Sequence, residues 1–146
     1  LCYRWEDTDA ALTDQLELER EGYAVTVEPG HAAIRFLNPT TAGDITQTIR
    51  TQFHRITRGT QTATRRDTGS SVYTVFDGSG VVTVGSFSWT VNRGDLFVVP
   101  SWQPLTITSE AGSTDSDSGA LDLFQFSDAP IFERLALART RVEDAR

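Results

Sequence analysis

The chain has 146 residues and a formal net charge of −7 at pH 7. That length suits one domain with a sizeable core, and the charge excludes the basic surface that binding to nucleic acid or to an anionic membrane requires. With a lone Cys2, no apolar run near about 18 residues and no signal peptide, the expectation is a soluble cytoplasmic protein without internal disulfides.

The first segment, residues 1–30, is expected to be a helix followed by a linker. Within residues 7–21 the apolar side chains, Leu12 and Leu16 among them, recur at helical spacing. Gly22 follows as a stop signal, because glycine readily adopts the left-handed conformation that ends helices.

The middle of the chain, residues 31–128, is predicted to be a β-barrel. Its apolar runs are short, rich in β-branched and aromatic residues, and separated by Gly, Asn, Asp or Pro. The predicted strands are AAIRFL, TIRTQFHRI, SSVYTVFD, GVVTVG, FSWTV, DLFVVP, PLTITS and ALDLFQFS. Strands at such close spacing indicate an all-β, antiparallel barrel or sandwich rather than alternating strands and helices.

The last segment, residues 129–146, is predicted to be a helix. Pro130 suits the first helical turn, where its missing N–H costs nothing. Ile131, Leu135 and Val142 would then form an apolar stripe facing the barrel.

Two glycine-containing frames in the middle segment resemble the paired sequence motifs of cupins. Gly59 and Gly78 match the outer glycines of the first motif, and SVYTVFDGSG follows its apolar strand into an acidic turn. Gly94 and Pro100 match the second motif in GDLFVVP. The two frames in this order predict a cupin double-stranded β-helix, a jelly-roll barrel, with short flanking helices at both ends.

Other residues occupy the positions that hold metal ligands in these motifs. By resemblance, Arg65 and Asp67 stand where cupins have two histidines, Ser71 where they have a glutamate, and Leu105 where they have a final histidine. Iron needs imidazole nitrogens and a carboxylate that converge on one point, and a guanidinium cannot coordinate it. We therefore expect no metal and no other cofactor in this segment.

The resemblance extends to a particular family. NPTTAGDITQTIRTQFHRI, GSSVYTVFDGSG, RGDLFVVPSWQP and LDLFQFSDAPIFERL together resemble the C-terminal cupin of gentisate 1,2-dioxygenase and of its salicylate and 1-hydroxy-2-naphthoate relatives. This resemblance implies a bicupin parent enzyme that cleaves an aromatic ring with O2 and Fe(II). It also implies that the iron lies in the N-terminal catalytic cupin of the parent chain, which would be this segment's partner. We further expect a homo-oligomer.

The candidates for lining a ligand pocket are Arg65, Asp67, Ser71, Tyr73 and Trp102. The first two lie two residues apart, so they share one face of a strand and point either into the barrel mouth or toward solvent. Core or interface packing is the competing role for Trp102. The two histidines lie outside the motif positions and are expected to be structural.

Two further functions remain open from the sequence. The first is a stand-alone, metal-free cupin that binds a small carboxylate through Arg65. The second is an independent metal enzyme, against which the missing ligands count. Because the chain contains no methionine, we expect a segment of a longer polypeptide.

Overall fold

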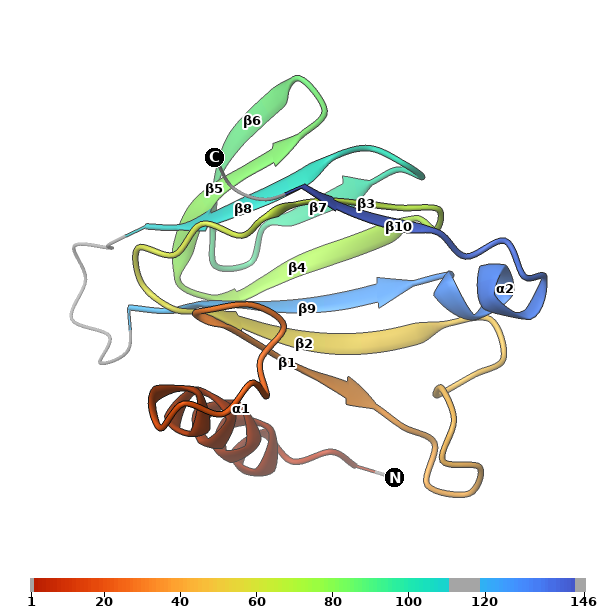
Figure 1. Ribbon diagram of the computed structural model, residues 1–146, viewed down its shortest axis with the longest axis horizontal. Helices are drawn as coiled ribbons and strands as arrows, with labels where there is room; N and C mark the ends of the chain where they lie inside the picture. Colours follow the sequence, from red (N-terminus) through yellow and green to blue (C-terminus); the bar gives the residue numbers. More distant parts are fainter. Residues whose placement is uncertain (1, 111–118, 144–146) are drawn as a thin grey trace.

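The computed structural model describes residues 2–110 and 119–143, which form two five-stranded antiparallel sheets that face each other (Figure 1). The strand order is β1-β2-β9-β4-β7 in the first sheet and β10-β3-β8-β5-β6 in the second. The strands are β1 (His31–Phe36), β2 (Arg50–Ile56), β3 (Thr64–Asp67), β4 (Ser71–Asp77), β5 (Ser79–Val84), β6 (Phe87–Asn92), β7 (Leu96–Val99), β8 (Leu105–Ser109), β9 (Leu121–Ser127) and β10 (Thr140–Glu143). The all-β cupin fold is confirmed, and each of the eight predicted strands is present.

The main core fills the space between the sheets because alternate residues of each strand point inward. Along β5, for example, Gly80, Val82 and Val84 are buried while their neighbours are partly exposed. The core residues are Ile56, Tyr73, Val75, Val82, Val84, Val91, Phe97, Val99, Leu105, Ile107, Leu121 and Leu123. This apolar cluster fixes the strands whose remaining inward side chains form the cavity described below.

Helix α1 (Trp5–Arg20) covers the outer face of the first sheet (Figure 1). Its Leu12 and Leu16 pack with Ala32 and Phe53 in a second apolar cluster. The helix begins earlier than predicted, and Trp5 in its first turn packs against the Phe53 ring, with 5.4 Å between ring centroids. Strand β2 is therefore covered on both faces, which explains why nearly all of its residues are buried.

The predicted C-terminal helix over residues 129–146 is wrong beyond its first turns. Helix α2 (Ala129–Arg134) ends in a pair of backbone hydrogen bonds, from Ala136 to Glu133 and from Leu137 to Phe132. This is the Schellman arrangement, with Ala136 at φ 56° in the position that usually carries glycine. The absence of a glycine hid the helix end from sequence reasoning.

The chain after α2 returns as strand β10 and pairs antiparallel with β3. Val142, predicted to lie on an apolar helix stripe, is instead the strand partner of Arg65. The final residues 144–146 of the predicted helix, and residues 111–118 of the loop before β9, lie outside the described part of the chain. Neither α1 nor α2, the helices of the described part, is long and apolar enough to cross a membrane.

The motif glycines occupy turns that require them. Gly59, Gly78 and Gly94 all have positive φ angles, of 76°, 84° and 90°. A Cβ on Gly78 would lie 2.2 Å from the carbonyl oxygen of Ala120. The turn between β4 and β5 therefore demands glycine for both its backbone conformation and its close approach to the chain before β9.

Candidate functional site

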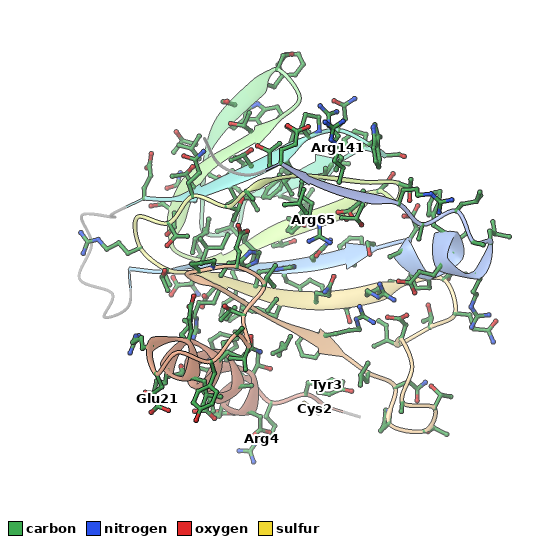
Figure 2. All side chains as sticks on the ribbon, viewed as in Figure 1. Cys2, Tyr3, Arg4, Glu21, Arg65 and Arg141 are labelled. Carbon is green, nitrogen blue, oxygen red and sulfur yellow. The ribbon has the colours of Figure 1, made fainter. Side chains whose placement is uncertain are left out.

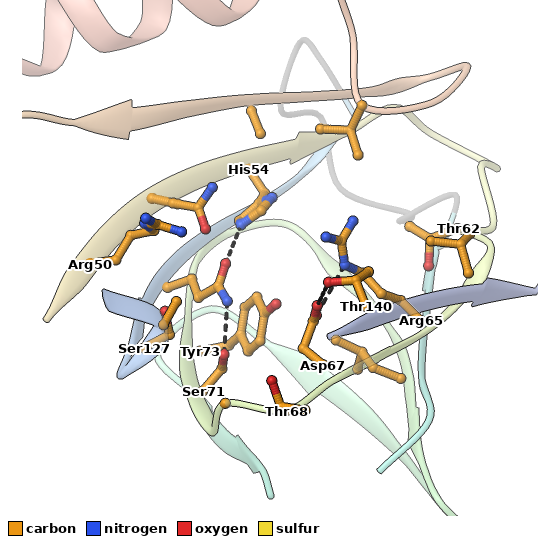
Figure 3. Close-up of a pocket in the computed structure, with 18 of the residues that line it drawn as sticks. Arg50, His54, Thr62, Arg65, Asp67, Thr68, Ser71, Tyr73, Ser127 and Thr140 are labelled. Atoms are coloured by element: carbon orange, nitrogen blue, oxygen red, sulfur yellow. Dashed lines mark hydrogen bonds and ion pairs between the residues drawn. The ribbon is translucent and has the colours of Figure 1, made fainter. Parts of the chain in front are cut away.

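A cavity of about 470 Å³ lies between the two sheets (Figure 3), and residues of α2 form part of its lining. Its floor and walls come from strands β1, β2, β4 and β9 of the first sheet and from β3, β8 and β10 of the second. The apolar part of the lining includes Val27, Leu105 and Ile107. Among the polar part are serine, threonine, histidine and arginine side chains, so the cavity combines an apolar body with hydrogen-bonding groups.

The four positions that correspond to cupin metal ligands all line this cavity. Arg65, Asp67, Ser71 and Leu105 come from three strands and converge on it. Arg65 and Leu105 are direct cross-strand partners between β3 and β8. The structure thus brings together the positions that the two motif frames select, although they lie up to 40 residues apart in sequence.

The residues at these positions do not fit iron. Asp67 supplies the one carboxylate, and both of its oxygens are engaged: one accepts from Arg65 Nε at 3.0 Å and the other from the Thr140 hydroxyl at 2.6 Å. Ser71 accepts a hydrogen bond from the side chain of Gln125 at 2.8 Å. Within residues 2–110 and 119–143, no group of three His, Cys, Asp or Glu side chains could hold a metal ion.

Both histidines lie in the cavity wall, a placement that sequence reasoning did not select. His31 Nε2 and His54 Nδ1 are 2.9 Å apart, and each residue is at least nine-tenths buried. The signal was present in the sequence, because Arg50, Gln52 and His54 alternate along β2 and all face the cavity. The two rings contact each other, and the structural role expected for them stays a prediction.

A chain of hydrogen bonds runs from the histidine pair to the former glutamate position. His54 Nε2 donates to Gln125 Oε1 at 2.6 Å, and Gln125 Nε2 donates to Ser71 Oγ at 2.8 Å (Figure 3). At the other end, Glu28 lies 3.2 Å from His31 Nδ1. This hydrogen bond to His31 holds the pKa of the Glu28 carboxyl below its usual value, although partial burial opposes it.

Burial dominates the titration of the groups deepest in the cavity. It lowers the pKa of His54 from 6.5 to about 3, because the imidazolium is disfavoured away from water and His31 lies alongside. It also raises the pKa of Tyr73, which is stacked on Phe97 with 4.9 Å between ring centroids. His54 is therefore neutral and Tyr73 is a phenol at neutral pH.

The predicted pocket candidates divide into two groups. Arg65, Asp67, Ser71 and Tyr73 line the cavity, and Figure 2 shows Arg65 between the layers of the barrel. Trp102 does not line it. It lies in the turn before β8 with φ 63°, and its backbone N–H donates to the carbonyl oxygen of Asp67 at 2.7 Å. A ligand-binding role for any of these residues stays a prediction.

The lining of the cavity is more basic than the chain as a whole. Four arginines line it, at positions 35, 50, 65 and 139, against three carboxylates, at positions 28, 67 and 133. The chain itself carries a net charge of −7. Arg50 is bound by both Asp44 and Glu133, so the charges around the cavity are nearly balanced, in contrast to the chain as a whole.

The fold and this cavity define a cupin domain whose ligand positions do not suit a metal. Comparisons with known proteins identify the enzymes to which the chain is similar. No protein-family model matches the chain. It is 49% identical to a gentisate 1,2-dioxygenase from Streptomyces sp. over 95% of its own length and 37% of that protein. It is 30% identical to a 1-hydroxy-2-naphthoate 1,2-dioxygenase from Nocardioides sp., over 92% of its own length and 32% of that protein.

Comparison with solved structures finds the same group of enzymes. A salicylate 1,2-dioxygenase from Pseudoaminobacter salicylatoxidans, solved as an adduct with gentisate, superposes with a TM-score of 0.89 at 51% identity. The match covers 98% of this chain and 37% of that one. The chain is homologous over nearly its whole length to a segment of the gentisate and salicylate 1,2-dioxygenases. It spans little more than a third of the length of these relatives.

Proposed function

We propose that the chain is the C-terminal, metal-free cupin portion of a ring-cleaving enzyme of the gentisate 1,2-dioxygenase type, with a structural role in that enzyme. One observation carries the proposal. A chain 49% identical to a gentisate 1,2-dioxygenase, over 37% of that enzyme, has Arg65, Ser71 and Leu105 around the cavity where a catalytic cupin needs metal ligands. The chemistry of the parent must then reside elsewhere in the parent chain.

In this proposal the parent enzyme inserts O2 into a hydroxybenzoate ring in the cytoplasm. Its Fe(II) is held by the N-terminal catalytic cupin, which is the direct partner of this segment. The segment's own contribution is to stabilise that cupin and the subunit contacts of a homo-oligomer.

Apolar side chains on two edge strands support a role in assembly. Phe87 and Trp89 on β6, and Leu96 and Val98 on β7, are each about half exposed or more. Edge strands with exposed apolar residues are sites where another chain or domain adds. A partner domain that covers β6 and β7 would bury this surface.

The test is iron binding by the 146-residue chain alone. The purified chain is incubated with Fe(II) without oxygen, desalted, and analysed for iron and for gentisate-dependent O2 consumption. We expect neither stoichiometric iron nor activity, and the full-length Streptomyces enzyme treated in the same way provides the positive control. Stoichiometric iron that is lost in an Asp67→Ala variant would place a metal in the barrel and contradict the proposal.

A further inference from the structure

The cavity presents hydrogen-bond donors that the protein itself leaves unused. Arg65 uses Nε to bind Asp67, whereas its two Nη groups make no hydrogen bond to any described residue. Figure 3 shows the guanidinium extending away from Asp67 into the space beside His54. Asp67 thus holds the stem of Arg65 and leaves the forked end available for a bidentate acceptor.

Tyr73 adds a second donor at the base of this space. Its side chain is about nine-tenths buried, yet its hydroxyl makes no hydrogen bond to the described part of the chain. The hydroxyl oxygen is not among the buried side-chain atoms without a partner, so it opens onto the cavity and can take a partner there. The Tyr73 hydroxyl faces the cavity between His54 and Asp67, where a bound molecule can supply that partner (Figure 3).

Ser71 provides a third donor through the hydrogen-bond chain that begins at the histidines. Gln125 donates to the oxygen of Ser71, so the serine keeps its own O–H proton free to donate into the cavity. His54 fixes the orientation of the Gln125 side chain by donating to its oxygen. Ser71 therefore accepts from Gln125 and keeps its own proton to donate into the cavity.

The nearest carboxylates are already engaged with other groups. Asp67 accepts from Arg65 Nε and from the Thr140 hydroxyl, and Glu28 lies against His31. Three donors, one of them a cation, then converge on a space whose other walls include Leu105 and Ile107.

We propose that this cavity binds a small organic carboxylate with an apolar body. Arg65 would bind the carboxylate, Tyr73 and Ser71 would complete its hydrogen bonds, and the apolar wall would contact the rest of the molecule. A volume of about 470 Å³ lies within the usual size of small-molecule sites. The inference does not depend on the reaction of the parent enzyme, because it concerns binding by this chain without a metal.

Calorimetric titration of the 146-residue chain with benzoate tests the proposal, with benzamide as an uncharged probe of the same shape. We expect benzoate to bind and benzamide to bind at least about tenfold more weakly, the cost of one charge-assisted hydrogen bond. Arg65→Met should weaken benzoate binding by a similar factor, and Tyr73→Phe by about threefold or more.

Arg66→Met is the matched control, because Arg66 is the next residue of β3 and does not line the cavity. It should leave benzoate affinity within about twofold of the unmodified chain. Circular dichroism confirms that each variant is folded, and Arg65→Lys provides a second variant that keeps the charge but not the fork. No benzoate binding at millimolar concentration, equal affinity for benzamide, or an Arg65→Met variant that binds as the unmodified chain would each overturn the proposal.

Discussion

Arg65 donates from Nε to Asp67 at 3.0 Å while the two side chains remain 45% and 48% exposed. The two residues, placed on one strand face by their spacing, therefore lie within hydrogen-bonding reach of each other. The two side chains line the cavity, yet solvent reaches both of them, so the pair combines the two orientations that the sequence left open. Its role in stability then differs from that of a buried ion pair.

The Asp67→Ala variant should lose less than about 1 kcal/mol of unfolding free energy, because solvent screens a half-exposed pair. Chemical denaturation at constant ionic strength measures the change. Thr140→Val, which removes the hydroxyl that donates to Asp67, is a matched control of the same contact. A loss near 3 kcal/mol in Asp67→Ala would show that Arg65 is desolvated in solution.

A different ion pair is buried enough to dominate stability. Arg55 binds Asp122 through two hydrogen bonds of 2.9 Å, and the side chains are only 9% and 6% exposed. Asp122→Ala should cost about 3–5 kcal/mol, because it leaves the Arg55 charge buried without its main partner. Asp9→Ala removes the other carboxylate bound to Arg55, which is half exposed, and should cost less than about 1 kcal/mol in the same denaturation assay.

The buried His54 should make stability fall in mild acid. Its pKa is lowered from 6.5 to about 3 by burial and by the adjacent His31, so between these values the unfolded chain takes up a proton that the folded chain does not. The contribution of neutral His54 to the free energy of unfolding is therefore complete above pH 6.5. It declines as the pH falls toward 3, by up to about 1.4 kcal/mol per pH unit.

Urea denaturation between pH about 7 and about 5 measures this decline, with His54→Gln as the comparison. The variant keeps a group that can contact Gln125 and Tyr73 but cannot titrate. Its stability should therefore vary less with pH than that of the unmodified chain. Parallel curves for the two proteins would show that groups other than His54 govern the acid response.

The exposed apolar residues on β6 predict self-association of the isolated chain. Phe87 and Trp89 are stacked with 6.1 Å between ring centroids and are 66% and 46% exposed. Light scattering over a concentration series should show a dimer or larger species, and a Phe87→Ser, Trp89→Ser variant should shift it toward monomer. Tyr23→Ser, at an exposed residue outside the strands, is the control, and a monomer at every concentration would contradict the prediction.

The end of α2 offers a test of backbone strain. Ala136 adopts φ 56°, where a Cβ costs about 1–2 kcal/mol that glycine avoids. Ala136→Gly should therefore raise the unfolding free energy by about 0.5–1 kcal/mol after the added freedom of the unfolded chain is subtracted. Ala138→Gly, a position without a positive φ, should lower it, and thermal unfolding of both variants makes the comparison.

The sequence predicted the barrel well because strand alternation and turn glycines are local signals. Gly59, Gly78 and Gly94 could be recognised in this way, and so could the strands between them. The tail could not, because its helix ends at an alanine and β10 depends on pairing with a strand more than 70 residues earlier.

In the candidate site, only the residues that lie within the two motif frames could be predicted from the sequence. Arg65, Asp67 and Ser71 were found through the motif frames and converge on the cavity. His54 was not, because its place depends on which face of β2 turns inward once α1 covers the other. Its burial and its hydrogen bond to Gln125 arise from tertiary packing across 71 residues of sequence.

Strand β10 is the last part of the cavity wall along the chain. Thr140 and Val142 supply part of its wall, whereas every other wall strand lies before residue 128. The Thr140 hydroxyl meets Asp67 across a sequence separation of 73 residues, so this contact requires the tail of the chain. During synthesis from the N-terminus, the sheets can therefore assemble first, and the cavity becomes enclosed when the tail docks against β3.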